Sequence, residues 1–227
     1  MKQKENKKKE RLPREFYSIH FEKIKKYLPD LKNAKTLEVG CQSAYFSVPF
    51  AAAGAECHCI DNEEKELEKG VRRFKELGLK ANFALMDGFD LKFKDNSFDL
   101  VFNHGVIEHF KRDKQDKMLQ EMKRVSKNLV YVSVPNKFHP HSRNIKKESK
   151  TKKETCTGFK WEFEFYPFSF SELKNLFERN SLQILELFGS LHWFHKNKKI
   201  NAFLQKTIGL LSGFELCVLA KKTKNTK

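Results

Sequence analysis

The chain has 227 residues, a formal net charge of +16 and 39% hydrophobic residues. This length and composition suit one α/β domain with a modest appendage and allow a sizeable core. No apolar run approaches the roughly 18 residues of a membrane-spanning helix, so no transmembrane segment is predicted. The five cysteines have no regular spacing, which favours a reduced, cytoplasmic protein over a disulfide framework.

Most of the positive charge lies in three segments, residues 1–14, 146–154 and 221–227. Such segments attract any anion, including nucleic acid, without specifying one, and the simpler interpretation is that they are only solvated. Residues 1–12 are expected to form a disordered basic arm, because they lack a repeating apolar pattern. Residues 13–227 are expected to form a single domain.

Apolar periodicity predicts alternating helices and strands up to residue 135. Gly54 and Gly78 stand where helix C-caps belong. Strands that alternate with helices imply crossover connections and a parallel sheet. The expected order is a helix after Pro13, strand 36–40, helix 43–53, strand 55–60, helix 62–77, strand 81–86, strand 98–103, helix 106–126 and strand 129–135.

The pattern changes after Pro135. Residues 136–158 are polar and predict a loop or lid, whereas residues 159–166 alternate aromatic and charged side chains, as a two-faced strand does. A helix is expected at about 170–180, with Ser169 or Ser171 as its N-cap. The remaining expected elements are an antiparallel pair of strands at 182–188 and 214–220 and, between them, an amphipathic helix at 199–211 that packs on the domain or meets a membrane.

Acids end the first three predicted strands. Glu38 precedes Gly40 in a strand–turn–helix pattern that typically receives the polar end of a ligand. Asp61 and Asp87 close the next two strands. Because the carboxyl ends of parallel strands share one edge of the sheet, these side chains are expected to meet at one binding site.

Glu38-x-Gly40, Asp61, Asp87 and the stretch from Phe98 to Phe110 resemble the class I S-adenosylmethionine-dependent methyltransferases. The resemblance spans roughly residues 30–190 and is closest to the ubiquinone/menaquinone-type branch with small-molecule acceptors. It implies a Rossmann-like, seven-stranded, mostly parallel sheet flanked by helices, with an antiparallel last pair of strands. It also implies S-adenosylmethionine as methyl donor, S-adenosylhomocysteine as product and a substrate cap at about 136–168.

The resemblance also implies roles for individual residues. Glu38 would accept hydrogen bonds from the donor's amine, and Asp61 would accept both ribose hydroxyls. The other implied contacts with the donor are Gly40 and Gln42 in the turn, Asn62 beside the ribose, Asp87, Gly88 and Phe89 around the adenine, and Asn103 and His104 near the methionine moiety and the reacting methyl group.

Each assignment has a simpler structural alternative. Glu38 could only cap a helix, Asp61 could form a capping box with Glu64, and Asp87 could only be a turn residue. In the turn, Gln42 and Ala44 replace the second and third glycines of the family pattern. The Gln42 side chain could crowd the carboxylate end of the donor or donate a hydrogen bond to it.

His104 and His109 are the candidate catalytic residues, since a hydroxyl acceptor needs a general base. His139 and His141 are further candidates, and Glu108 with His109 could instead be structural. Cys57-His58-Cys59 is interpreted as a buried strand, because alternation points His58 away from the two thiols and no second ligand pair follows. No metal site is predicted.

The leading hypothesis is methyl transfer to a small, apolar or aromatic acceptor by direct in-line displacement. Asn103-His-Gly-Val lacks the Asn/Asp-Pro-Pro-aromatic stretch of amino-methylating DNA enzymes, and Val134-Pro135-Asn136 lacks the cysteine of RNA cytosine-C5 enzymes. The alternatives are an RNA- or ribosome-directed methyltransferase that uses the basic segments and a binding protein that has lost the donor.

Overall fold

The computed structural model describes residues 14–140, 142, 164–190 and 213–223. Within these residues, the strands form one seven-stranded sheet in the order β3-β2-β1-β4-β5-β7-β6. The strands are β1 Lys35–Val39, β2 Glu56–Asp61, β3 Asn82–Leu85, β4 Phe98–His104, β5 Ser126–Pro135, β6 Leu182–Ser190 and β7 Glu215–Lys222.

The first five strands pair in parallel, whereas β7 pairs antiparallel with both β5 and β6. The strand order reverses between β1 and β4, because the chain moves outward from β1 to β3 and then returns to the other side of β1. A reversal of this kind opens a crevice at the carboxyl ends of the strands, where α/β folds bind ligands. The predicted fold class, including the antiparallel last pair of strands, is confirmed.

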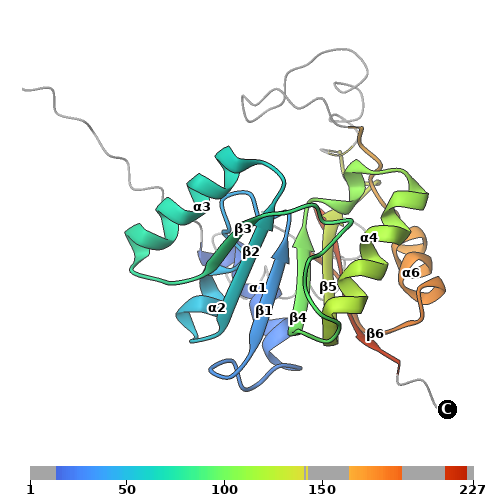
Figure 1. Ribbon diagram of the computed structural model, residues 1–227. Helices are drawn as coiled ribbons and strands as arrows, with labels where there is room; N and C mark the ends of the chain where they lie inside the picture. Colours follow the sequence, from blue (N-terminus) through green and yellow to red (C-terminus); the bar gives the residue numbers. More distant parts are fainter. Residues whose placement is uncertain (1–13, 141, 143–163, 191–212, 224–227) are drawn as a thin grey trace, which may run out of the picture.

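Helices cover both faces of the sheet (Figure 1). α4 and α6 pack on one face, and α1, α2 and α3 pack on the other. In Figure 1, α4 and α6 lie at the β5–β6 end of the sheet, and α2 and α3 lie toward β2 and β3. The helices are α1 Arg14–Lys25, α2 Val48–Ala52, α3 Glu64–Leu77, α4 Arg112–Val125 and α6 Phe170–Arg179, with a short 3-10 helix, η1, at Ile107–His109.

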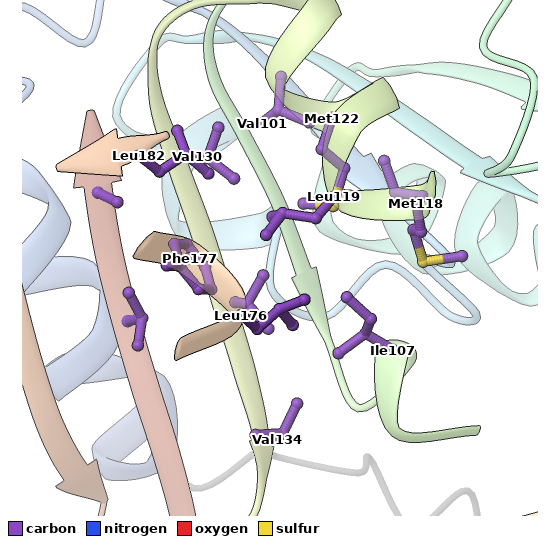
Figure 2. Close-up of a cluster of buried hydrophobic side chains, with 14 of the residues drawn as sticks. Val101, Ile107, Met118, Leu119, Met122, Val130, Val134, Leu176, Phe177 and Leu182 are labelled. Carbon is purple, nitrogen blue, oxygen red and sulfur yellow. The ribbon is translucent and has the colours of Figure 1, made fainter. Parts of the chain in front are cut away.

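The α4–α6 face carries the larger apolar core (Figure 2). Leu119 and Met122 of α4 and Phe177 of α6 are fully buried against Val101 and Val130 of the central strands. On the opposite face, a second cluster packs α1 and α2 on the sheet. α1 is also held by charge, because Lys23 and Lys26 of this part of the chain both donate to Glu186 of β6 at 3.0 Å.

Two predicted helices have different bounds. The helix expected at 43–53 begins only at Val48, because Gln42 and Ala44 adopt positive φ values that no α-helix allows. The helix expected at 106–126 is divided into η1 and α4. Between them, Lys111 is extended, with a ψ of 162°, and therefore ends the helical path.

Helix termini were otherwise predicted well. Gly78 is the left-handed C-cap of α3, with a φ of 66°, whereas Gly54 lies one residue beyond the Ala53 C-cap of α2. Ser169 caps α6 and forms a reciprocal capping box with Glu172. This pair stabilises the start of α6, where the chain returns from the segment expected to form a cap.

Much of that expected cap, and all of the helix expected at 199–211, lie outside the described residues, as does the basic arm at 1–12. Residues 164–166, expected to end a two-faced strand, belong to no strand. At the base of the expected cap, Asn136, which follows β5, forms an isolated parallel bridge with Phe168. In the described part of the chain, no helix has the length and apolarity needed to cross a membrane.

Candidate functional site

The turn after β1 has three residues in the left-handed backbone conformation that glycine adopts most easily. Gly40, Gln42 and Ala44 have φ values of 71°, 45° and 54°, all in the left-handed region. This region costs a non-glycine residue roughly 1–2 kcal/mol. The N–H groups of Gly40 and Cys41 both donate to the carbonyl oxygen of Ile60 at 2.9 Å, which ties the turn to β2.

Buried and half-buried side chains support this turn from both sides. The Ser47 hydroxyl donates to Glu38 Oε2 at 2.5 Å, and burial raises the pKa of the Glu38 carboxyl to about 8. Arg73 of α3 donates to the carbonyl oxygen of Ser43 at 2.9 Å, and its guanidinium carbon lies 3.1 Å from the centre of the Tyr45 ring. Glu38 therefore supports the turn, and its contact with the donor's amine stays a prediction.

Two close contacts explain why small residues stand near the turn. A Cβ atom on Gly40 would lie 2.6 Å from a methyl group of Val106, so only glycine allows this packing. A Cβ atom on Gly70 of α3 would lie 2.7 Å from the Phe83 ring and 3.4 Å from the carbonyl oxygen of Gln42. The turn and α3 can therefore pack closely at Gly70.

Asp61 lies at the end of β2 beside the turn. Its two carboxylate oxygens accept hydrogen bonds from the backbone N–H groups of Gln42, at 2.7 Å, and Glu63, at 3.0 Å. Burial raises the pKa of Asp61, while these hydrogen bonds oppose the shift. The capping-box alternative with Glu64 is wrong, because the N-cap of α3 is Glu63, which makes no side-chain capping bond. Each Asp61 oxygen can still accept a hydroxyl, and Asn62 is exposed beside it.

Asp87, Gly88 and Phe89 follow β3 at the same edge of the sheet. Asp87 is exposed and accepts a hydrogen bond from the Phe89 N–H at 2.9 Å, as its alternative role as a turn residue requires. A Cβ atom on Gly88 would lie 2.9 Å from a methyl group of Val39. The Phe89 ring packs edge-on against Phe110 at 4.7 Å between ring centres. Their contact with the adenine stays a prediction.

Asn103 and His104 end β4. Asn103 is fully buried, and its amide nitrogen lies 3.4 Å from the sulfur of Met122, whereas its Oδ1 has no hydrogen-bond partner among the described residues. His104 stacks on Phe46 at 3.8 Å between ring centres, and its Nε2 lies 2.6 Å from Glu215 Oε1. His104 therefore stands on the α1 face, and Asn103 stands on the α4 face.

Glu108 and His109 lie on η1 rather than on α4. The Glu108 carboxyl is buried, burial raises its pKa to about 8, and its Oε2 has no hydrogen-bond partner in the described part of the chain. His109 Nδ1 lies 3.3 Å from the carbonyl oxygen of Glu164, and burial lowers the pKa of His109. His109 thus contacts the base of the expected cap, whereas His139 packs edge-on against Phe214 and His141 is outside the described residues.

The Cys57-His58-Cys59 strand behaves as a core strand. Both thiols are buried, and His58 points to the opposite side, where Nε2 lies 3.0 Å from Glu56 Oε1. Sequence reasoning missed a different group, His20, Glu215 and Cys217, whose potential ligand atoms lie within 4.8 Å of one another. The signal that could have revealed this group is that Glu215 and Cys217 alternate with apolar residues and so lie on one side of β7.

Residues 36–128 match the methyltransferase domain family. A ubiquinone biosynthesis O-methyltransferase from Pelagibacter ubique is 29% identical over 116 residues, which are 51% of this chain and 48% of that protein. Residues 36–128 are thus similar to methyltransferase domains. Norajmaline N-methyltransferase from Rauvolfia serpentina is 30% identical over 136 residues, which are 56% of this chain and 46% of that protein.

Solved structures share the methyltransferase fold. Magnesium protoporphyrin IX methyltransferase from Synechocystis PCC 6803, with bound S-adenosylhomocysteine, gives a TM-score of 0.65 at 15% identity over 90% of this chain and 81% of that chain. A methyltransferase from Methanosarcina mazei gives 0.64 at 19% identity over 84% of this chain and 93% of that chain. The chain spans just under half the length of the two curated relatives.

Proposed function

We propose that this chain binds S-adenosylmethionine and transfers its methyl group to a small-molecule acceptor. The observation that carries the proposal is the meeting of four strand ends at the reversal of strand order. The carboxyl ends of β1, β2, β3 and β4 bring the left-handed turn, Asp61, Asp87 and His104 to one edge of the sheet. This is the position at which doubly wound sheets bind nucleotide-like ligands.

The described residues fit the donor. Asp61 is held in place by two backbone N–H groups and keeps acceptor capacity for the ribose hydroxyls. Glu108 and Asn103 each present a buried oxygen without a hydrogen-bond partner among the described residues, and a positively charged donor offers a favourable partner to a buried carboxyl. When bound, the donor supplies an activated methyl group, so the protein has only to orient the acceptor and exclude water.

A small acceptor is favoured over RNA. The names of the curated relatives refer to ubiquinone biosynthesis and to norajmaline, both small molecules. Phe165 is half-buried beside His109, with 6.2 Å between the ring centres, and so adds an aromatic wall at this edge. We infer a cytoplasmic location from the cysteine pattern.

The test is thermal unfolding with and without S-adenosylhomocysteine. At about a hundredfold excess over the dissociation constant, binding adds about 2.7 kcal/mol, which corresponds to roughly 5–10 °C for a chain of this size. Asp61→Asn should reduce the shift by more than half, because it removes the charge that strengthens the hydrogen bonds to the ribose. The exposed Asp90→Asn is the matched control and should keep the full shift. No shift in the unaltered protein at millimolar ligand would refute donor binding.

A further inference from the structure

One edge of the sheet carries a groove outside the candidate site. It lies between α3 and β3, has a volume of about 580 Å³ and is lined on the strand side by Phe83, Ala84 and Leu85. Both elements stand at the end of the sheet away from α4 and α6 (Figure 1). The helix contributes a set of residues with helical spacing, which we call the α3 stripe and which consists of Glu64, Leu67, Glu68, Val71, Arg72 and Lys75.

The strand β3 offers unpaired backbone groups at this edge. Among the described strands it pairs only with β2, and the Met86 N–H donates to the carbonyl oxygen of Asp61 at 2.9 Å. Since successive residues of a strand point their N–H and C=O groups to opposite sides, Phe83 and Leu85 point theirs away from β2. A row of such groups is a template for a further strand.

Apolar side chains stand beside this edge. Leu85 is 60% exposed, and Val71 of α3 is 47% exposed. Leu85 lies on the α3 side of the strand, because Phe83, two residues earlier, packs edge-on against Phe74 of α3 at 5.4 Å between ring centres. The helix and the strand therefore present apolar surface to the same groove.

The charges of the α3 stripe change sign along the helix. The acids Glu64 and Glu68 lie in its first half, and the bases Arg72 and Lys75 lie in its second half. All four side chains are exposed, and none of them forms an ion pair with another residue that the structure describes. A second, reversed copy of the stripe would place Lys75 opposite Glu64 and Arg72 opposite Glu68.

The helix and the strand have their centres at the same level, so one two-fold axis can relate both to a second copy. The acid–base pairs of the stripe are centred at or next to Gly70, and a Cβ atom on Gly70 would lie only 2.7 Å from the Phe83 ring. On the strand, an axis at Ala84 sets Phe83 opposite Leu85 of the second copy. Because both residues point their backbone groups outward, each such pair can exchange two hydrogen bonds.

We propose that a second copy of this chain docks in this groove about a two-fold axis. The two α3 helices lie antiparallel, the two β3 strands join the sheets of both copies into one, and Val71 and Leu85 of each copy fill the groove of the other. The order of charges favours this occupant, because a partner of uniform charge would oppose like charges over half of the α3 stripe. The dimer requires no bound donor, so it can be tested apart from the proposed function.

The opposite edge of the sheet lacks this complementarity. A groove of about 540 Å³ also lies between α6 and β6, and its lining includes Lys174 and Glu178. These two side chains pair with each other along α6 at 3.3 Å. The charges of the α6 groove are therefore matched within one copy, whereas those of the α3 stripe are matched only by a second copy.

The first experiment measures the mass of the full chain by sedimentation equilibrium, from micromolar to millimolar concentration. We expect a reversible dimer with twice the 26.8 kDa mass of the chain. The buffer contains 0.15 M salt, which screens charges more than about 8 Å apart and so limits repulsion between the basic segments of the two copies. A monomer at millimolar concentration would overturn the proposal and leave the groove to a different protein or to solvent.

The second experiment reverses half of the α3 stripe at a time. Glu64→Lys with Glu68→Lys makes the stripe basic, and Arg72→Glu with Lys75→Glu makes it acidic. Each double variant alone opposes like charges across the axis, so its self-association should be weaker by at least ~10-fold. An equal mixture of the two variants restores every acid–base pair and should regain the dimer, which also shows that both variants are folded.

The control keeps the α3 stripe intact. Glu76→Lys with Glu178→Lys reverses two exposed acids outside the α3–β3 groove and adds the same charge as the basic variant. It should dimerise like the unaltered chain. A control that weakens the dimer as much as the basic variant, or a mixture of the reversed variants that stays monomeric, would overturn the pairing of the α3 helices.

The third experiment tests the strand at Leu85, whose N–H points away from β2. Leu85→Pro removes this donor and leaves the β2–β3 ladder complete, so it should weaken the dimer more than Leu85→Ala, which removes only the side chain. Hydrogen exchange gives a second readout without substitution, because the Phe83 and Leu85 amides should exchange more slowly at millimolar than at micromolar concentration. Equal exchange at both concentrations, or equal dimerisation of the two variants, would overturn the joined sheet.

Discussion

The two faces of the central sheet differ in what they bury. The face under α4 and α6 is dominated by aliphatic and aromatic side chains, from Val101 to Phe177 (Figure 2). The face under α1 and α2 also has an apolar cluster, but it buries Glu38, His20 and Glu215 among the rings and thiols. The α4–α6 face thus buries mainly apolar side chains, with Asn103 among them, whereas the α1 face buries several polar and ionisable groups near the candidate site.

Polar groups are tolerated on the α1 face because they are paired. His20 meets Tyr131 at 2.5 Å, and His104 meets Glu215 at 2.6 Å. A buried polar group without such a partner costs roughly 1–3 kcal/mol in proteins. Apolar residues of the same volume would fill this space at lower cost, so the network stabilises the α1 face less than apolar packing would.

The largest expected effect is on stability at the apolar face. Phe177→Ala should lower the free energy of unfolding by about 3–5 kcal/mol, because it leaves a cavity in the α4–α6 core. Urea denaturation measures this loss, and S-adenosylhomocysteine affinity in the folded variant should stay within twofold. The control is Phe138→Ala, at a residue that is 57% exposed, with an expected change below about 0.5 kcal/mol. Loss of ligand affinity in folded Phe177→Ala would contradict the prediction that the α4–α6 core affects stability without affecting the candidate site.

The next effect depends on pH and on the buried carboxyl of Glu108. Burial raises its pKa to about 8 from a usual value of 4.5. Below pH 4.5 both the folded and unfolded chains hold the proton. Between pH 4.5 and 8 only the unfolded chain releases it, so this contribution to stability is lost as the pH rises through this window. Between pH 5 and pH 8.5 the loss amounts to roughly 4 kcal/mol.

Glu108→Gln should remove this part of the pH dependence. Urea denaturation at pH 5 and at pH 8.5 measures the change in unfolding free energy between the two pH values, which should be smaller in the variant. Glu178→Gln, at an exposed acid paired with Lys174, should leave the slope unchanged. A slope that is the same in Glu108→Gln and in the unaltered chain would show that Glu108 ionises normally.

Local sequence patterns were sufficient to predict the sheet and the positions of the two acids Asp61 and Asp87 at its edge. Alternating strands and helices predicted the parallel order, and the acids Asp61 and Asp87 follow their strands at the expected edge. These predictions succeed because each depends on a few consecutive residues. The roles of the two acids toward the donor remain predictions, since the contacts observed are with the protein's own backbone.

The pairing of His104 with Glu215 could not be predicted, because it depends on a contact between distant segments. His104 and Glu215 are 111 positions apart in the sequence and meet only after β7 inserts next to β5. The helix expected at 43–53 was too long for a related reason. The pattern of apolar residues was helical, but the bonds from the turn to Ile60 and Asp61 hold Gln42 and Ala44 in left-handed conformations.

The smallest expected effect concerns the turn itself, where backbone and side chain can be separated. Gln42→Gly relieves a left-handed conformation but increases the freedom of the unfolded chain, and these effects nearly cancel, within about 0.5 kcal/mol. S-adenosylhomocysteine affinity, measured by calorimetry, should stay within threefold, because the bond to Asp61 comes from the backbone N–H that glycine retains. Gly40→Ala should be more disruptive, since its Cβ would meet Val106 at 2.6 Å. A tenfold gain in affinity in Gln42→Gly would mean that the side chain obstructs the donor, and a tenfold loss would mean that it binds the donor.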